Sequence, residues 1–241
     1  GNYVDFKKIS DNYITIHPNS TETSLSGIRI GAGRADEISN NTIIIPQTPA
    51  TTRTTYGIYF TTATNYIKEI SNNKIYIENA TTAYGMYLTV MNTATDTTSK
   101  TLITNNEITS NATGTNYGIY ATTIYNTHLY HNSVYVSGGG ATSRAFHEGT
   151  AASTGSLKNN ILVNMGGTSS GTANNAVYFT GTATNNWEIS NNNYYAIGAN
   201  LAYGASAYRA DLATWKTAVT QDSNSINVLP PFANINKNLV L

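Results

Sequence analysis

The sequence predicts an all-β fold, a parallel β-helix solenoid of about seven coils, and two observations support that prediction. The first is a four-residue phrase of the type Ile-Ser-Asn-Asn, which recurs seven times along the chain. The second is the alternation of apolar and polar residues around each phrase, which is typical of half-buried strands. Successive phrases are 26 to 33 residues apart, and each interval holds about three such stretches and no helical pattern, as expected for one solenoid coil.

Each predicted coil has strands on both sides of the phrase. The strand after the phrase is clearest at 13–16, 42–45, 74–77 and 133–136. Another strand lies upstream of a phrase, at 27–30, 57–60, 85–88, 118–121, 144–147 and 176–179. Coils of this kind stack about 4.8 Å apart, so we expect the strands to form parallel sheets.

The last residue of every phrase is Asn, and these residues are expected to form a ladder. An Asn at a corner tolerates the left-handed backbone of a sharp turn, and Asn side chains one coil apart can exchange amide hydrogen bonds. The alternative is a sandwich of hairpins, but that fold shows turn signals every 8 to 12 residues or so rather than one phrase at one corner. The predicted ladder consists of Asn12, Asn41, Asn73, Asn106, Asn132, Asn160 and Asn192.

Residues 201–241 break the repeat and are expected to cap the coils of residues 1–200 within the same domain. Asp211 is a good N-cap for a short amphipathic helix at about 211–220, and an extended tail follows it. The open end of a solenoid exposes unpaired strands and an uncovered core, which such an element would close. The residues expected to plug the core are Leu212, Trp215 and Val219.

The Ile-Ser-Asn-Asn-x-Ile-x-Ile phrases, over about residues 6–198, resemble those of right-handed parallel β-helix proteins of the pectate-lyase-like superfamily, in the form found in secreted bacterial repeat proteins. The Leu-x-x-Trp and Asp-x-x-Ser elements at 212–215 and 222–225 are similar to a segment of such proteins. The resemblance implies a right-handed solenoid with an Asn ladder inside one corner. It also implies secretion or display at the cell surface, carbohydrate binding along one sheet, and a longer parent chain.

Charged residues are scarce: they make up 11% of the chain, where about 25% is usual. The 13 Lys and Arg residues balance the 13 Asp and Glu residues, so the net charge is zero. A neutral chain offers no field for a phosphate backbone, so nucleic acid is not an expected partner. The absence of Cys excludes disulfides and cysteine zinc sites. No apolar run reaches the 18 residues or so of a membrane span, and residues 1–8 lack a signal peptide's apolar segment. We therefore expect no membrane insertion and no cofactor, and any secreted form to be mature or excised.

The strands upstream of the phrases predict a file of outward aromatic residues, if Ile58 and Phe60 face the core. We expect this file to bind a glycan or a partner surface. The alternatives are that the rings only stabilise neighbouring strands, by about 0.2 to 1 kcal/mol a pair, or that the register is different. The predicted ligand-binding residues are Tyr59, Tyr87, Tyr120, Phe146 and Tyr178.

The least regular coil holds the candidates for catalysis. Arg144, His147 and Glu148 lie within five residues of one another and could supply a base and a charge-neutralising group. A salt bridge or a loop anchor is the favoured interpretation, because the resemblance implies that catalysis would need several acidic calcium ligands, and none accompanies this strand. His128 and His131 are three residues apart on a strand and so point to opposite faces, which argues against a metal site.

The sequence thus predicts a secreted or cell-surface module with a structural and adhesive role, which recognises a polysaccharide or a surface protein through its aromatic file. The alternative is a polysaccharide lyase or glycoside hydrolase that acts on an extracellular polysaccharide. Low charge favours the first function, since few ionisable groups are present from which to build an active site.

Overall fold

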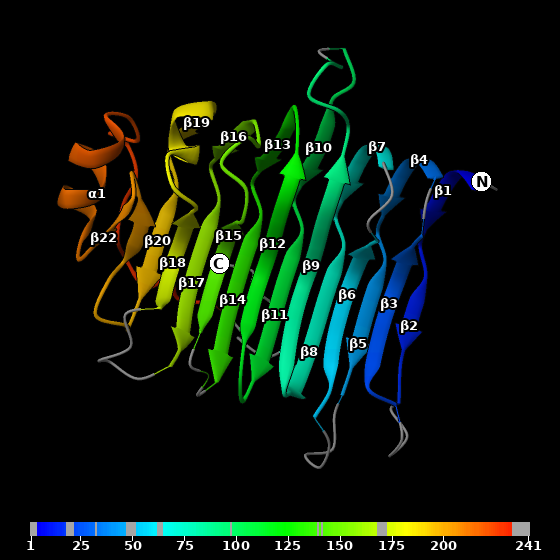
Figure 1. Ribbon diagram of the computed structural model, residues 1–241. Helices are drawn as coiled ribbons and strands as arrows, with labels where there is room; N and C mark the ends of the chain where they lie inside the picture. The colour runs from blue at the N-terminus through cyan, green and yellow to red at the C-terminus, as the bar shows by residue number, and fades with distance from the viewer. Residues whose placement is uncertain are drawn as a thin grey trace.

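The computed structural model describes residues 4–17, 22–31, 33–46, 52–61, 65–96, 98–138, 140, 142–167 and 173–232. Over these residues the chain is an all-β parallel solenoid of about six turns with one short helix near its C-terminal end (Figure 1). The predicted parallel β-helix is therefore confirmed. The last part of the expected tail, 233–241, lies outside the described residues.

Each turn contributes one strand to each of three faces, which we call the β1, β2 and β3 faces. Seven parallel strands stack on each face, so the chain makes about six full turns from the first strand of a face to the last, as the pairing registers show. The β1 face consists of β1 (Val4–Ser10), β4 (Gly33–Ser39), β7 (Asn65–Ser71), β10 (Thr101–Thr104), β13 (Thr127–Tyr130), β16 (Gly155–Lys158) and β19 (Trp187–Ser190). The β2 face consists of β2 (Tyr13–Thr15), β5 (Thr42–Ile45), β8 (Lys74–Ala80), β11 (Glu107–Ala112), β14 (Ser133–Gly138), β17 (Ile161–Gly166) and β20 (Asn193–Ala196). The β3 face consists of β3 (Ser24–Ile30), β6 (Thr54–Phe60), β9 (Thr82–Met91), β12 (Asn116–Ile124), β15 (Ser143–Glu148), β18 (Asn174–Phe179) and β21 (Ala202–Gly204).

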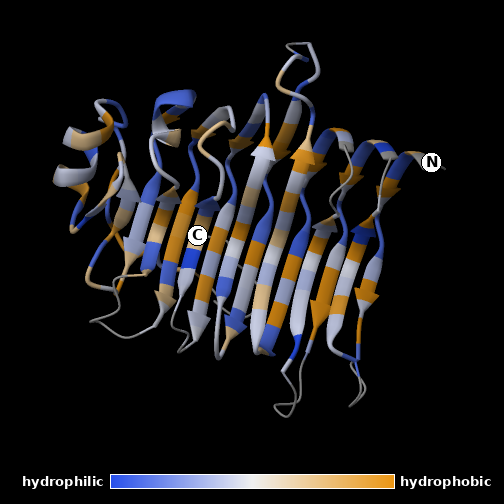
Figure 2. Cartoon of the chain, viewed as in Figure 1, coloured by the Kyte–Doolittle hydropathy of each residue, from blue (hydrophilic) through white to orange (hydrophobic). Residues whose placement is uncertain are grey.

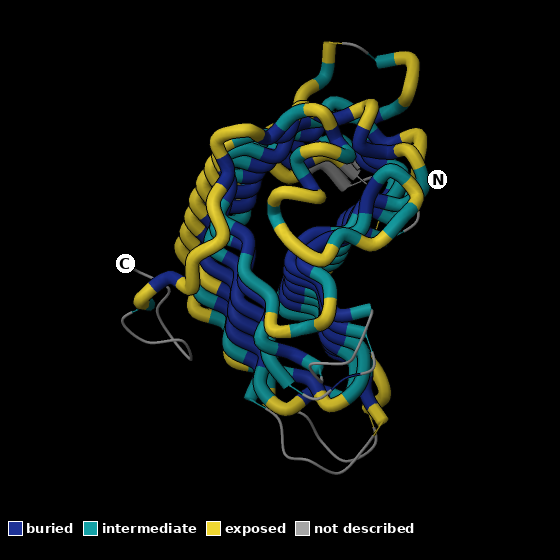
Figure 3. The backbone as a smooth tube through the Cα atoms, turned by 90° about the vertical axis from the view of Figure 1, so that its left-hand side faces the viewer, coloured by how far each residue is buried: buried dark blue, intermediate teal, exposed yellow. Residues whose placement is uncertain are grey.

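The core is a set of apolar rows that run along the solenoid axis. Alternation along each strand points every second side chain into the core, and Figure 2 shows this alternation of hydropathy along the ribbons. The in-register pairing of the strands then stacks each apolar side chain on its equivalent in the next turn. Seen from the helix end, buried positions form the walls and exposed positions lie mainly on the outer surface and at the corners (Figure 3). One such row, with at most 2% of each side chain exposed, comprises Ile38, Ile70, Ile103, Leu129, Leu157 and Ile189.

The asparagine ladder is present and runs through the corner between the β1 and β2 faces. Asn73 is typical: its amide Nδ2 donates to Asn106 Oδ1 at 3.0 Å and to the Ile38 carbonyl at 2.9 Å, and its backbone N–H donates to the same Asn106 Oδ1 at 3.0 Å. The same bonds between successive turns join all the predicted members. Every member except the terminal Asn12 is at most 1% exposed, so the ladder satisfies polar groups that no water reaches.

The left-handed residue of this corner is not the ladder Asn, and on this point the sequence-based expectation was wrong. The residue before each ladder Asn has the positive φ, as in Asn72 at 54° and His131 at 57°. The turn therefore needs a residue that tolerates αL, and Asn or Asp does so best. The ladder Asn itself supplies only the amide side chain.

A row of glycines lies where the β3 face approaches the β2 face. A Cβ on Gly85 would lie 2.3 Å from Ile108 Cγ2 and 2.5 Å from the Gly118 carbonyl oxygen, and Gly57 has the same environment. These positions therefore require glycine because of the close approach of the next turn and the core.

We predict that Gly85→Ala lowers the free energy of unfolding by about 2 kcal/mol, because the core must move to admit one methyl group. Gly31→Ala is the matched control, since nothing lies within 4 Å of its Cβ position. Chemical denaturation of both variants measures the difference. An equal effect of the two substitutions would contradict the close packing described above.

The C-terminal end of the solenoid is closed by the short helix α1 (Leu212–Val219). Asp211 accepts a hydrogen bond from the Thr214 backbone in a capping box, and Thr220 ends the helix with φ of 54°. Of the predicted plug, Trp215 and Val219 are buried and Leu212 packs partly buried against the core. Before the helix, β22 (Ala207–Arg209) pairs antiparallel with β21, and the 3-10 helix η1 (Ala183–Asn186) precedes β19. Within the described part of the chain, we find no helix of the length and apolarity that a membrane crossing requires.

Candidate functional site

The outer surface of the β3 face bears two files of aromatic residues, where the sequence predicted one. Tyr59, Tyr87 and Tyr120 are in register in the predicted file. A second file beside it, Tyr56, Tyr84 and Tyr117, was missed. These six tyrosines, which we call the tyrosine layer, are all partly exposed.

The second file exists because the strand alternation slips by one residue in each turn. Gly57 and Ile58 are both buried, so Tyr56 before them and Tyr59 after them both return to the outer surface, as at a β-bulge. The phrase Tyr-Gly-x-Tyr occurs in three successive turns and is the sequence signal that marks this arrangement.

The rings of the tyrosine layer are packed against one another. Tyr56 stacks on Tyr59 with centroids 4.2 Å apart and on Tyr84 at 5.1 Å, and Tyr87 stacks on Tyr120 at 4.9 Å. Edge-on contacts link the two files, such as Tyr84 to Tyr87 at 5.0 Å. Burial also raises the pKa of Tyr87 to about 12, so its hydroxyl is protonated at neutral pH. Ring faces are largely used within the layer, and hydroxyls and ring edges remain to meet a partner.

Phe146, predicted as a member of the outward file, is a core residue. It is fully buried and contacts Phe179 at 5.4 Å and Trp187 at 5.7 Å between ring centroids. It pairs in register with Ile119, and the neighbouring His147 takes the position equivalent to Tyr120. The irregular strand β15 therefore continues the layer with histidine in place of tyrosine.

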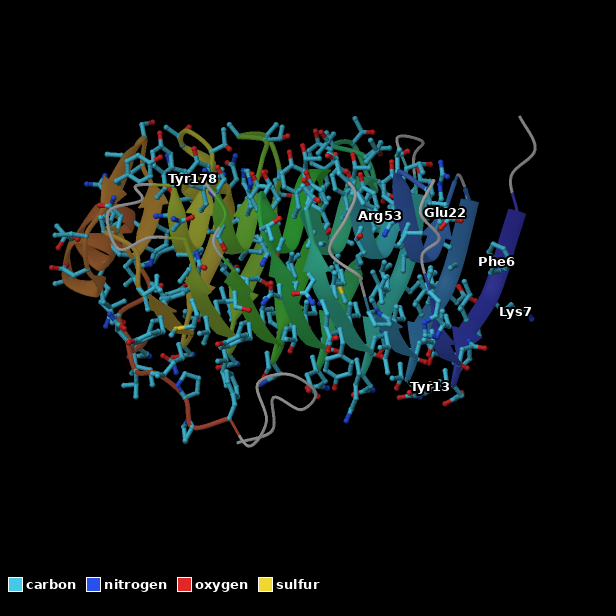
Figure 4. All side chains as sticks on the ribbon, turned by 90° about the horizontal axis from the view of Figure 1, so that it is seen from below. Phe6, Lys7, Tyr13, Glu22, Arg53 and Tyr178 are labelled. Atoms are coloured by element: carbon cyan, nitrogen blue, oxygen red, sulfur yellow. The ribbon has the colours of Figure 1, made fainter. Side chains whose placement is uncertain are left out.

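Beyond β12 the aromatic surface continues with His147, Tyr178 and Tyr203. The ring centroid of His147 lies 4.7 Å from that of Tyr120 and 4.8 Å from that of Tyr178, and Tyr178 stacks on Tyr203 at 4.4 Å. Tyr178 lies along one long side of the solenoid, and the exposed Tyr13 of the β2 face lies along the other (Figure 4).

Arg144 takes the place in the second file that Tyr117 has in the previous turn. Its guanidinium carbon is 3.5 Å from the ring centroid of Tyr178 and 5.8 Å from that of Tyr117, and its Nη1 is 3.1 Å from His147 Nδ1. Burial and the Arg144 charge lower the pKa of His147 to about 2, so the imidazole is neutral. A neutral ring nitrogen can accept a hydrogen bond from Arg144.

Glu148 is separated from the other two catalytic candidates. It pairs in register with Ala121 and Phe179, both core positions, and it is fully buried. One carboxyl oxygen accepts a hydrogen bond from the Thr150 backbone at 2.7 Å, and Oε2 has no partner. Arg144 and His147 lie on the outer surface of the strand, so the three residues do not form one site.

The buried carboxyl of Glu148 predicts a pH-dependent stability. Burial raises its pKa from 4.5 to about 7, so the folded protein binds this proton more tightly than the unfolded chain does. The contribution of Glu148 to the free energy of unfolding is therefore fully present below about pH 4.5 and is lost as the pH rises toward and through 7.

We predict that the free energy of unfolding of the wild type falls by about 2 to 3 kcal/mol relative to Glu148→Gln between about pH 5 and pH 8. Urea denaturation of both proteins at several pH values measures this difference in the free energy of unfolding. Glu188→Gln is the control, because its ion pair with Lys158 lowers the pKa of Glu188 below this range. If the free energies of unfolding of wild type and Glu148→Gln changed in parallel with pH, the prediction would be contradicted.

The two histidines considered for a metal site belong to different surroundings. His128 contacts Ser156 Oγ through Nδ1 at 2.7 Å and Asn126 Oδ1 through Nε2 at 3.0 Å, whereas His131 is exposed at the corner. Ser156 is fully buried, so the contact resembles a structural network rather than an accessible nucleophile. Among the described residues, no group of three or more His, Asp or Glu side chains is placed to hold a metal.

Charged residues gather instead on the β1 face, beside a cleft of about 910 Å³. The cleft is bordered by residues 92, 96 and 98–100 and by strands β4 and β7. Its lining includes both acidic and basic side chains, among them Arg34, Asp36, Glu37, Lys68, Glu69 and Lys100. Several charges pair with one another, as Lys68 Nζ does with Asp36 Oδ1 at 2.6 Å and Lys8 Nζ with Glu37 Oε1 at 3.1 Å. Mutual neutralisation of this kind leaves little net charge for a ligand.

No family model matches the chain, and no curated protein and no solved structure matches it.

Proposed function

We propose that this protein is a structural and adhesive solenoid module that binds a partner surface through the tyrosine layer. The observation that supports this most is the layer itself: six partly exposed tyrosines in two registered files, with ring centroids 4.2 to 5.7 Å apart. Tyrosine combines apolar contact area with a hydroxyl and loses little entropy on binding. A rigid sheet that presents many such groups is suited to a flat, extended contact.

The ring packing favours contacts through hydroxyls and ring edges over stacking on sugar faces. Stacking on a sugar needs a free ring face, and most faces here lie against another ring. Phenol hydroxyls can hydrogen-bond to polar groups of a protein or of a glycan. A glycan thus stays within the proposal, although the predicted mode of binding by stacking has less support.

Secretion or display on the cell surface is part of the same proposal. The low content of charged residues and the resemblance to secreted repeat proteins support it. The resemblance to the pectate-lyase-like superfamily also supports a place within a longer parent chain.

The alternative function, a polysaccharide lyase or glycoside hydrolase, has less support at the predicted residues. Arg144 and His147 are separated from Glu148 by the strand, and Glu148 is fully buried. We expect no unsaturated products and no new reducing ends from acidic or neutral polysaccharides. Turnover that is lost in Arg144→Ala would favour the enzyme.

The proposal predicts that Tyr87→Phe combined with Tyr120→Phe weakens binding about tenfold while the melting temperature stays unchanged. The double variant keeps both rings stacked and removes only two hydroxyls. Binding is measured against the tightest ligand found on an array of polysaccharides and immobilised proteins.

Tyr13→Phe is the matched control, because Tyr13 is 73% exposed on the β2 face and should not affect binding. Tyr87→Ala with Tyr120→Ala separates the two modes of contact. If only the Ala pair loses affinity, the rings and not the hydroxyls make the contact. If neither pair loses affinity, the tyrosine layer is not the binding surface.

A further inference from the structure

Arg144 is a buried cation for which the described chain supplies no acidic partner. Only 8% of the residue is exposed, and its Nε has no hydrogen-bond partner. None of the ion pairs among the described residues includes it. Its neighbours among the described residues are the rings of Tyr117 and Tyr178, with centroids 5.8 and 3.5 Å from the guanidinium carbon, and His147, to which it is hydrogen-bonded.

This environment differs from that of the other arginine on the same face. Arg29, at the opposite end of the aromatic surface, lies 5.5 Å from the Tyr59 ring centroid but is exposed and solvated. Arg144 is enclosed, and its contact with the Tyr178 ring at 3.5 Å only partly replaces the water it has lost. Removing a charge from water without an opposite charge is unfavourable, and an incoming anion would relieve that cost.

We propose that Arg144 and His147 form a carboxylate subsite of the tyrosine layer, which receives an Asp or Glu side chain of a partner protein. This inference rests on the proposed function and names the partner's chemistry. The guanidinium donates to the carboxylate oxygens in a fixed planar geometry. The neutral imidazole and the surrounding phenols hold the guanidinium in place and add no competing negative charge.

The burial of Arg144 favours an acidic side chain over an acidic sugar. An Asp or Glu carboxylate is carried on a slender, flexible stem that can reach a group with 8% exposure. A uronate carboxylate is attached directly to its sugar ring, so the whole ring would have to enter. Tyrosine and arginine are also among the residues enriched at the centres of protein interfaces.

The test compares binding of an acetylated, amidated hexaglutamate peptide with binding of hexaglutamine and of a galacturonate hexamer. We expect wild type to bind hexaglutamate, and Arg144→Met to weaken that binding at least tenfold. Arg29→Met is the matched control, because it removes an equal charge from the same face, and it should change the affinity less than twofold.

A second readout separates a ligand site from a structural role. If the guanidinium lacks a counter-charge, Arg144→Met should leave the melting temperature of the free protein unchanged or raise it. A fall of about 5 °C or more, or failure to fold, would show that Arg144 is structural and would overturn the inference.

Three binding results would also overturn the inference: no binding of hexaglutamate, equal affinity of wild type and Arg144→Met, or Arg144-dependent binding of the galacturonate hexamer alone. The last would assign the subsite to an acidic glycan. The tyrosine substitutions above test the layer separately, so failure of the subsite and failure of the proposed function give different patterns.

Discussion

Asn106→Ala is expected to lower the free energy of unfolding by about 4 kcal/mol, because it breaks the ladder at its centre. The Asn106 side chain accepts hydrogen bonds from the backbone and the amide of Asn73, and it donates to the Ile70 carbonyl and to Asn132 Oδ1, both at 2.9 Å. The residue is 1% exposed, so water cannot easily replace the lost partners. Several buried polar groups would remain unsatisfied at once, each at a cost of about 1 to 3 kcal/mol before relaxation.

Asn12→Ala is the matched control for this prediction. Asn12 is the exposed first member of the ladder, where solvent can replace the amide. Equilibrium denaturation in guanidinium chloride should therefore show a loss below about 1 kcal/mol for Asn12→Ala. If Asn106→Ala were no more harmful than Asn12→Ala, the ladder would not stabilise the solenoid.

Trp215→Ala is expected to cost a similar amount, about 4 kcal/mol, because it opens the C-terminal end of the core. The indole is fully buried, and its centroid lies 6.2 Å from those of Phe179 and Tyr194. Its Nε1 donates to Asp222 Oδ2 at 2.7 Å, and Tyr194 donates to the same oxygen at 2.8 Å. The substitution removes both the apolar plug and one donor to a buried carboxyl group.

Two further variants separate these contributions. Trp215→Phe keeps much of the apolar volume and removes the indole N–H donor. The fall in the free energy of unfolding in this variant therefore measures mainly the loss of the hydrogen bond to Asp222. Leu212→Ala, on the same helix but only partly buried, should cost less than half as much as Trp215→Ala. A loss below about 1 kcal/mol for Trp215→Ala would show that the helix does not close the core.

The end of the ladder shows how the cap joins the repeat. The backbone N–H of Asn192 donates to Ser225 Oγ at 2.7 Å, in place of the next Asn, and Ser225 in turn donates to Asp222. The Asp-x-x-Ser element noted in the sequence thus supplies the last step of the ladder. Its role could not be read from the sequence, because it depends on a contact across 33 residues.

The fold was predictable because one physical requirement recurs in every turn. Each corner needs an αL residue followed by an amide, and each wall needs inward apolar residues, so the same phrase returns at a nearly constant interval. The predicted ladder was correct at every position for this reason. The residue with positive φ was assigned wrongly, because the residue before the ladder Asn is usually also an Asn. Residue type therefore does not tell which of the two has the left-handed backbone.

The wrong placement of Phe146 on the outer surface has its origin in strand β15. Ala145 stands in register where earlier turns have the buried glycine, so Arg144 and His147 correspond to the two tyrosines and Phe146 to a core Ile. Matching Phe146 to Tyr by aromatic character shifts the register by one residue and exchanges its inner and outer sides. The second file of tyrosines was missed for a related reason, since strict alternation does not anticipate the slip at Gly57.

The most direct test of the proposed function is an NMR titration of the protein with its 18 tyrosines labelled with ¹³C at Cζ. The tightest ligand from the array is added, and the Cζ signals are followed. We expect the shifts to change at the tyrosine layer, Tyr56, Tyr59, Tyr84, Tyr87, Tyr117 and Tyr120, while Tyr13, Tyr66 and Tyr130 on the other faces stay constant. Changes confined to the other faces, with the layer unmoved, would contradict the proposal that the tyrosine layer binds the partner.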